Sequence, residues 1–108
     1  MGKRFLTFAT AAILNAVSNG YSFGFDIVDI TGMPGGTVYP ALRRLEESGF
    51  LTSKWEKESV ASADARPRRK YYEITRTGRG ALAEAVKRYR LLGEPSTPKL
   101  REPRSSRA

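Results

Sequence analysis

The sequence predicts an α+β fold, a winged helix-turn-helix with an added C-terminal dimerisation helix. Three observations support this prediction. An amphipathic helix over about residues 35–48 follows a shorter helix and a turn. Two strand-like segments then flank a basic loop and make a β-hairpin, and a further amphipathic helix follows the second strand. We expect a winged helix-turn-helix over residues 1–75, the dimerisation helix over 76–93, and a disordered basic tail over 94–108.

The composition indicates a small, basic, globular protein. Hydrophobic residues make up 40% of the 108 residues, and 19 Lys and Arg stand against 11 Asp and Glu, a formal net charge of +8. The segment 94–108 contributes +2, so +6 falls on the expected folded part. An excess of this size favours a polyanionic partner, such as nucleic acid or an anionic membrane surface.

Cysteine and histidine are both absent. Their absence excludes disulfides, Cys or His zinc sites, and a histidine general base. The adjacent carboxylates Glu46 and Glu47 diverge around a helix, and no glycine-rich phosphate loop follows a strand. We therefore expect no catalytic residues, no metal and no cofactor. The apolar run after Lys3 and Arg4 is interrupted by polar residues and too short to span a bilayer, so we expect a cytoplasmic protein without membrane contact.

The first helix is expected over residues 5–18, and its apolar surface is wider than one small core needs. Such a helix often packs against another subunit. Gly20 ends it, because glycine readily adopts the left-handed conformation found at helix C-termini. Ser22 is the expected N-cap of a second helix over about 23–31. The residues of this helix expected to face inward are Phe23, Ile27 and Ile30.

The helix over residues 35–48 has two distinct faces. One is an apolar stripe that suits a core: Val38, Ala41, Leu42 and Leu45. The opposite face carries Gly36, Tyr39, Pro40, Arg43 and Glu47. Pro40 is tolerated only near a helix start, since proline lacks the backbone donor that later turns require. An outward aromatic residue followed one turn later by arginine suits a helix in a DNA major groove; the alternative is an ordinary solvated helix surface.

The hairpin strands are expected over residues 50–57 and 70–75, with a mobile loop of small and polar residues over 59–69 between them. The end of this loop is strongly cationic, with Arg66, Arg68, Arg69 and Lys70. Because the hairpin directly follows a candidate recognition helix, we interpret residues 58–70 as a DNA-contacting wing and not as a solvated loop.

The last helix is expected to begin near an N-cap at Thr77 and to run to about Leu92. Its apolar stripe consists of Leu82, Ala85, Val86 and Tyr89. The sole tryptophan, Trp55, lies in the first strand of the hairpin, where we expect it to pack in the core or at an interface.

A resemblance to the PadR-type bacterial transcriptional regulators rests on two runs, GGTVYPALRRLEESGFLTSKWE and RPRRKYYEITRTGRGAL. The resemblance covers residues 24–82 well and the first helix loosely. The family often has His-Gly-Tyr-Glu at the start of the second helix, where this chain has Phe23-Gly24-Phe25-Asp26, and a polar capping residue where Pro34 stands. The matching features are Thr37, Tyr39, Pro40, Leu42, Leu45, Gly49, the segment 69–72, Thr75 and Gly78.

Short family members have a single helix after the wing, which forms the dimer interface together with the first helix. The resemblance implies a homodimer of this kind. Some short members also hold flat aromatic drugs against a tryptophan of the last helix. Since the last helix here has no tryptophan, that drug site is not carried over, and a small-molecule effector is left unassigned. The interface residues implied by the resemblance are Phe5, Phe8, Ala12, Leu82, Val86 and Tyr89.

The leading hypothesis is a homodimeric, sequence-specific repressor that binds a pseudo-palindromic operator in double-stranded DNA. Thr37 and Tyr39 would enter the major groove with Arg43 behind them, and the four wing cations would contact phosphates or the minor groove. One alternative is a winged-helix module that binds a protein and does not read DNA; the charge of +6 argues against it. An RNA-associated protein is a weaker alternative, because Tyr71 and Tyr72 point to opposite faces and form no stacking platform.

Overall fold

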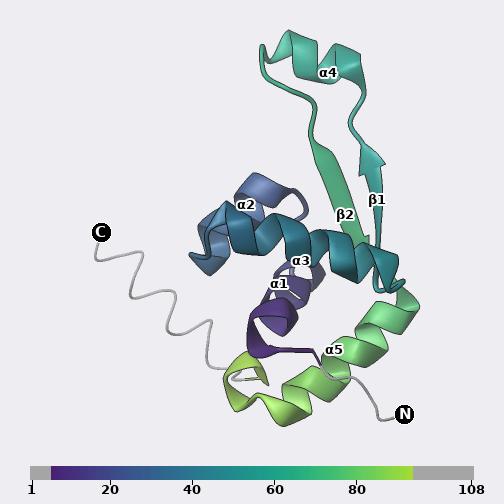
Figure 1. The fold of residues 1–108 in the computed structure, drawn as a ribbon. Coiled ribbons are helices and arrows are strands. Elements are labelled where there is room, and N and C mark those ends of the chain that lie inside the picture. Colours follow the sequence, from purple (N-terminus) through teal and green to yellow (C-terminus); the bar gives the residue numbers. More distant parts are fainter. Residues whose placement is uncertain (1–5, 94–108) are drawn as a thin grey trace.

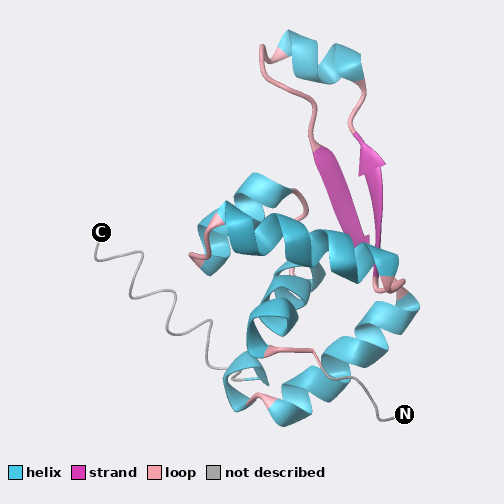
Figure 2. Cartoon of the chain, viewed as in Figure 1, coloured by secondary structure: helices cyan, strands magenta, loops and turns pink. Residues whose placement is uncertain are grey.

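The computed structural model describes residues 6–93, which form a helical body and a projecting β-hairpin (Figure 1). The elements are α1 (Phe8–Ser18), α2 (Gly24–Thr31), α3 (Gly35–Glu47), β1 (Leu51–Trp55), α4 (Glu58–Ala63), β2 (Lys70–Ile74), α5 (Arg76–Arg88) and the 3₁₀ helix η1 (Arg90–Gly93). Figure 2 shows the two strands leaving the helices, with α4 between them at the far end of the hairpin. The predicted α+β winged helix-turn-helix is confirmed.

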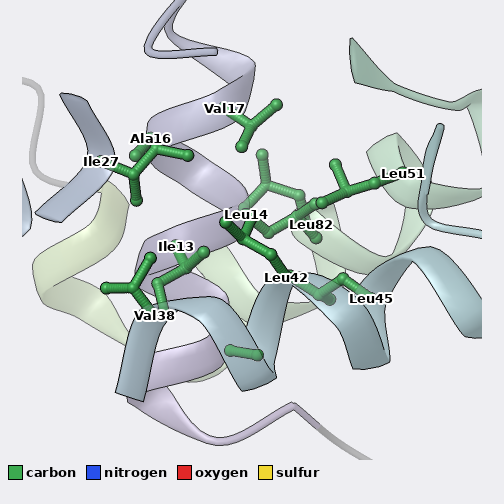
Figure 3. Close-up of a cluster of buried hydrophobic side chains, with 11 residues drawn as sticks. Ile13, Leu14, Ala16, Val17, Ile27, Val38, Leu42, Leu45, Leu51 and Leu82 are labelled. Carbon is green, nitrogen blue, oxygen red and sulfur yellow. The ribbon is translucent and has the colours of Figure 1, made fainter. Parts of the chain in front are cut away.

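The hydrophobic core lies where α1 meets the other helices. Helix α1 packs against α2, α3, α5 and β2. Figure 3 shows Val38, Leu42 and Leu45 of α3 pointing toward Ile13 and Leu14 of α1. All four residues of the predicted apolar stripe of α3 are buried, which confirms that stripe. Each fully buried aliphatic side chain of this kind contributes about 1.5–3 kcal/mol of transfer free energy.

The hairpin is an antiparallel pair in which Leu51 lies opposite Ile74 and Trp55 opposite Lys70. Thr75 joins its base to the helices. The Thr75 hydroxyl donates to the carbonyl of Gly49 at 2.7 Å and accepts a hydrogen bond from the amide of Gly78 at 2.9 Å. These bonds connect the end of α3, the wing and the first turn of α5, so they set the direction in which the hairpin projects.

The predicted mobile loop over residues 59–69 is wrong, because α4 occupies its first half. Ala61 of this helix is buried. The helix ends in a tight turn in which Ala65 adopts a left-handed conformation with φ 53° and the amide of Arg66 donates to the carbonyl of Ala61 at 3.1 Å. Alanine, serine and glutamate tolerate a helix, but a six-residue helix is too short to show a periodic pattern.

Both predicted N-caps are corrected. Phe23 occupies the N-cap of α2 without a capping side chain, and the carbonyl of Ser22 accepts a hydrogen bond from the amide of Tyr72 at 2.7 Å. Thr75, and not Thr77, caps α5. Both corrected positions lie next to β2: Ser22 is hydrogen-bonded to Tyr72 of this strand, and Thr75 directly follows it.

Other local expectations are partly corrected and partly confirmed. Helix α5 ends at Arg88, because Tyr89 is extended, and η1 replaces the expected last turn. Ile30 is exposed, so it does not face inward. Gly20 is left-handed with φ 101°, as predicted. Within residues 6–93, no helix is long and apolar enough to cross a membrane. The expected basic tail over residues 94–108 lies outside the described residues.

Candidate nucleic-acid interface

Helix α3 presents its polar face to solvent at the start of the helix. Thr37, Tyr39 and Arg43 are all exposed, and Tyr39 keeps 48% of its surface accessible although it packs against the first turn of α2. Pro40 lies in the second turn and leaves the rest of the helix intact. The three side chains predicted to enter a groove are therefore all accessible on α3. Tyr39 and Arg43, four positions apart, are neighbours on its surface, whereas Thr37 lies further around the helix.

Glu56 organises the wing, which the sequence analysis did not predict. Its side chain is only 7% exposed and forms a bidentate ion pair with Arg66, whose Nη1 and Nη2 lie 2.7 and 2.9 Å from the carboxylate oxygens. The carboxylate also accepts hydrogen bonds from the Arg69 amide at 3.1 Å and the Tyr71 hydroxyl at 3.3 Å. We call these four residues the Glu56 network. It connects the end of β1 to the segment that enters β2.

The protonation behaviour of Glu56 follows from this network. The hydrogen bonds from the Arg66 side chain lower the pKa of Glu56 most, and burial partly opposes them. The Arg69 amide, the charge of Arg66 and the Tyr71 hydroxyl lower it further, and the resulting pKa is about 2, against the usual 4.5. The same pairing raises the pKa of Arg66. Glu56 is thus ionised at neutral pH and neutralises one predicted wing cation.

The other three wing cations lie against aromatic rings. The Arg69 guanidinium lies 4.1 Å from the centroid of the Phe23 ring, and Arg68 and Lys70 lie 5.6 and 5.8 Å from the Trp55 ring. The sequence predicts a place for Trp55 in the core or at an interface. Trp55 is 56% exposed, so it does not pack in the core, and the interface stays a prediction. Its ring instead holds two cations at the wing surface.

A hollow of about 520 Å³ is bordered by both α3 and the wing. Tyr39 of α3 borders it from one side, and Arg68, Arg69 and Lys70 border it from the other. Its remaining lining consists of Phe23, Gly24, Phe25, Trp55, Arg66, Pro67 and Tyr72. Residues about 30 positions apart in the sequence therefore form one continuous aromatic and cationic surface.

The predicted dimer residues on α5 and at its C-cap pack within the single chain. Leu82 is buried within the core, and Val86 packs against its edge. The Tyr89 hydroxyl donates to the carbonyl of Leu6 at 2.7 Å, and its ring packs edge-on against Phe8 with centroids 5.4 Å apart. The apolar stripe of α5 is thus largely covered by α1.

The predicted dimer residues on α1 are more accessible. Phe8 is 43% exposed although it contacts Tyr89. Phe8 and Ala12 border a hollow of about 280 Å³ whose other apolar residues include the exposed Ile30 and the half-buried Met33. Phe5 lies outside the described residues.

The charge is distributed differently from the expectation. Residues 6–93 hold 13 Lys and Arg and nine Asp and Glu, a net charge of +4. Residues 76–90 hold five of these cations and one carboxylate, so residues 6–75, with eight of each sign, are neutral. Two of the charges counted in the expected +6 are Lys3 and Arg4, which lie outside the described residues. The excess of the described chain is therefore on α5 and η1.

These elements define a winged helix-turn-helix protein with an exposed helix face and a cationic wing. The chain belongs to the transcriptional regulator PadR-like family, whose family model matches residues 13–84. The resemblance drawn from the sequence is thereby confirmed, and members of this family are regulators and not enzymes. A search of curated protein sequences found no significant match.

Solved structures support the same assignment. A transcriptional regulator from Clostridium thermocellum is 26% identical, with 78% of this chain and 82% of that chain covered and a TM-score of 0.63. A PadR family transcription regulator from Clostridium difficile is 22% identical, with 87% and 99% covered and a TM-score of 0.67. Bacillus subtilis PadR, solved in complex with operator DNA, is 22% identical, with 77% and 50% covered and a TM-score of 0.64. The last two show the shared fold.

Proposed function

We propose that this chain is a sequence-specific DNA-binding repressor that acts as a homodimer. The observation that carries the proposal is the hollow bordered by both Tyr39 of α3 and the cations of the wing. A helix inserted in the major groove would bring the adjacent DNA backbone toward that cationic surface. Bacillus subtilis PadR, with the same fold, is known in complex with operator DNA.

In this proposal Thr37, Tyr39 and Arg43 read base edges in the major groove. Arg68, Arg69 and Lys70 contact phosphates or the minor groove, and their cation–π contacts limit their motion before DNA binds. Arg66 contributes to DNA binding mainly through the wing conformation, because its guanidinium is paired with Glu56. Base contacts supply discrimination of about 1–3 kcal/mol for each good bidentate pair.

The proposed dimer uses the accessible apolar surface of α1 at Phe8 and Ala12, together with Val86 and Tyr89 at its margin. Leu82 supports this surface from beneath. An Ala12→Glu variant should dissociate the dimer because it places a charge in an apolar contact. Sedimentation equilibrium over a range of protein concentrations measures this. An unchanged mass for Ala12→Glu would place the interface elsewhere.

The first test measures binding of the purified chain to its own upstream promoter DNA and to a scrambled duplex, each at two salt concentrations. Strong preference for the promoter with steep salt dependence supports a locally acting, self-regulating repressor. Equal and salt-labile binding to both duplexes means that the operator lies elsewhere or that the protein coats DNA.

Two variants distinguish sequence-specific recognition from overall affinity for DNA. Tyr39→Ala should weaken specific binding more than non-specific binding, because it removes a groove contact. Lys70→Ala should weaken both and reduce the slope of log affinity against log salt by about one unit. If Tyr39→Ala leaves promoter affinity intact, α3 is not the recognition helix.

A second candidate, a winged-helix module that binds a protein partner and does not read DNA, is favoured by the neutral charge of residues 6–75. It predicts no binding to either duplex at low salt, where non-specific contacts are strongest. A salt-insensitive complex with an acidic protein would support it.

A further inference from the structure

The ring of Tyr39 lies between the first residues of α2 and α3. A Cβ atom at Gly24 would overlap Cε1 of the ring and lie 2.7 Å from both Cζ and the hydroxyl oxygen. A Cβ atom at Gly35 would lie 3.3 Å from Cε2, on the opposite edge of the ring. The two glycines thus leave space for both edges of one aromatic side chain.

The backbone itself does not require glycine at these positions. The glycines with positive φ in the described chain are Gly20, Gly32 and Gly49, so Gly24 and Gly35 adopt conformations open to any residue. Alanine also has the higher helix propensity, and Gly24 is the first residue of α2. The overlap with Tyr39 therefore accounts for the missing side chain at position 24.

We infer that Gly24 is a positioning residue for Tyr39: it holds the tyrosine in one orientation, and that orientation is the one that discriminates between DNA sequences. The inference rests on the proposed function. A residue at position 24 with a Cβ would displace the ring from this place beside the hollow, which Tyr39 borders together with Arg69. The protein would then have to return the ring to its original orientation when it binds DNA, and this cost would lower DNA affinity.

The test is a double-mutant cycle with wild type, Gly24→Ala, Tyr39→Ala and the double variant. The probe is a duplex that wild-type protein selects from a random-sequence pool, compared with a scrambled duplex of the same composition. Gly24→Ala should lower affinity for the selected duplex about tenfold, comparable to the loss of one base contact. Its affinity for the scrambled duplex should stay within about twofold, the usual error of additivity.

In the Tyr39→Ala background the same Gly24→Ala change should have no effect on either duplex, because the clashing ring is absent. Gly80→Ala is the matched control, since a Cβ there meets nothing within 4 Å. Equal losses in both backgrounds, or no loss with Gly24→Ala alone, would overturn the inference.

A stability cycle in urea keeps the inference testable if Gly24→Ala folds poorly. The midpoint should fall for Gly24→Ala and recover in the double variant, since Tyr39→Ala removes the ring that the new Cβ would overlap. A double variant that remains as unstable as Gly24→Ala would show that Gly24 serves the fold independently of Tyr39. If wild type selects no duplex, the proposed function fails and the role in discrimination falls with it, while the stability cycle still decides the steric pairing.

Discussion

Gly78 lets α5 approach the start of the wing more closely than any other residue would. A Cβ atom there would overlap the carbonyl oxygen of Phe50 and lie 3.0 Å from its carbonyl carbon and 2.9 Å from Cγ1 of Ile74. The Phe50 carbonyl already accepts a hydrogen bond from the Thr75 amide at 3.0 Å, so it has little freedom to move. We predict that Gly78→Ala destabilises the protein although alanine is the better helix former.

The magnitude follows from comparison with Gly80→Ala in the same helix. Replacing glycine by alanine inside a helix raises stability by about 1 kcal/mol through helix propensity. This contribution is favourable in both variants. At Gly80 nothing lies within 4 Å of a Cβ, so the gain remains. At Gly78 the overlap with backbone adds a cost near the top of the range of about 1–3 kcal/mol for overpacking. Gly78→Ala should therefore be about 2 kcal/mol less stable than wild type and about 3 kcal/mol less stable than Gly80→Ala.

Urea denaturation followed by Trp55 fluorescence and by circular dichroism measures both variants at one protein concentration. The signs of the two changes should be opposite. Equal stability of Gly78→Ala and Gly80→Ala would refute the close packing of α5 on the strand, and with it the explanation of why glycine occupies position 78.

Three further predictions concern the wing and the core. The stabilisation that Glu56 provides should be complete above its usual pKa of 4.5 and decline as pH falls toward its folded pKa of about 2. In acid denaturation, wild-type stability should therefore fall more steeply below about pH 5 than the stability of Glu56→Gln. Parallel curves for the two proteins would exclude the network. Ala65→Gly should stabilise the wing by up to about 1 kcal/mol, because φ 53° strains a residue with a Cβ. Slower hydrogen exchange of the α4 amides would show this stabilisation, whereas faster exchange would contradict the left-handed turn. Leu42→Ala should lower the free energy of unfolding by about 2–5 kcal/mol, because it leaves a cavity in the core. Leu91 is 74% exposed, so Leu91→Ala should change it by less than about 0.5 kcal/mol in the same urea assay. Similar losses for both variants would contradict the core assignment.

The sequence predicts the parts of the fold that depend on local pattern. Val38, Leu42 and Leu45 repeat with helical spacing, and that spacing alone identifies the buried face of α3. The order of helices, turn and hairpin likewise follows from the glycines and prolines that mark the ends of these elements. These features need no knowledge of what the elements touch, and the structure confirms them.

The remaining features depend on contacts between distant residues. Glu56 meets Arg66 and Tyr71 only because β1 and β2 pair, and nothing near Glu56 in the sequence distinguishes it from a surface carboxylate. Gly24 is explained only by a ring fifteen positions later. Helix α4 is likewise missed because its single buried residue, Ala61, forms no pattern.

The same distinction applies to charge. The net charge of +8 suggests a uniformly basic protein, yet residues 6–75 are neutral. Three carboxylates in this region pair with wing cations. Glu56 and Asp64 both bind Arg66, and Glu46 lies 3.6 Å from Lys70. Arg66 of the wing is therefore paired, and Arg68 and Arg69 lie against aromatic rings. Under the proposed function, a surface of this kind would limit non-specific attraction to DNA, and discrimination would come from the geometry of α3 and the wing and not from the total charge.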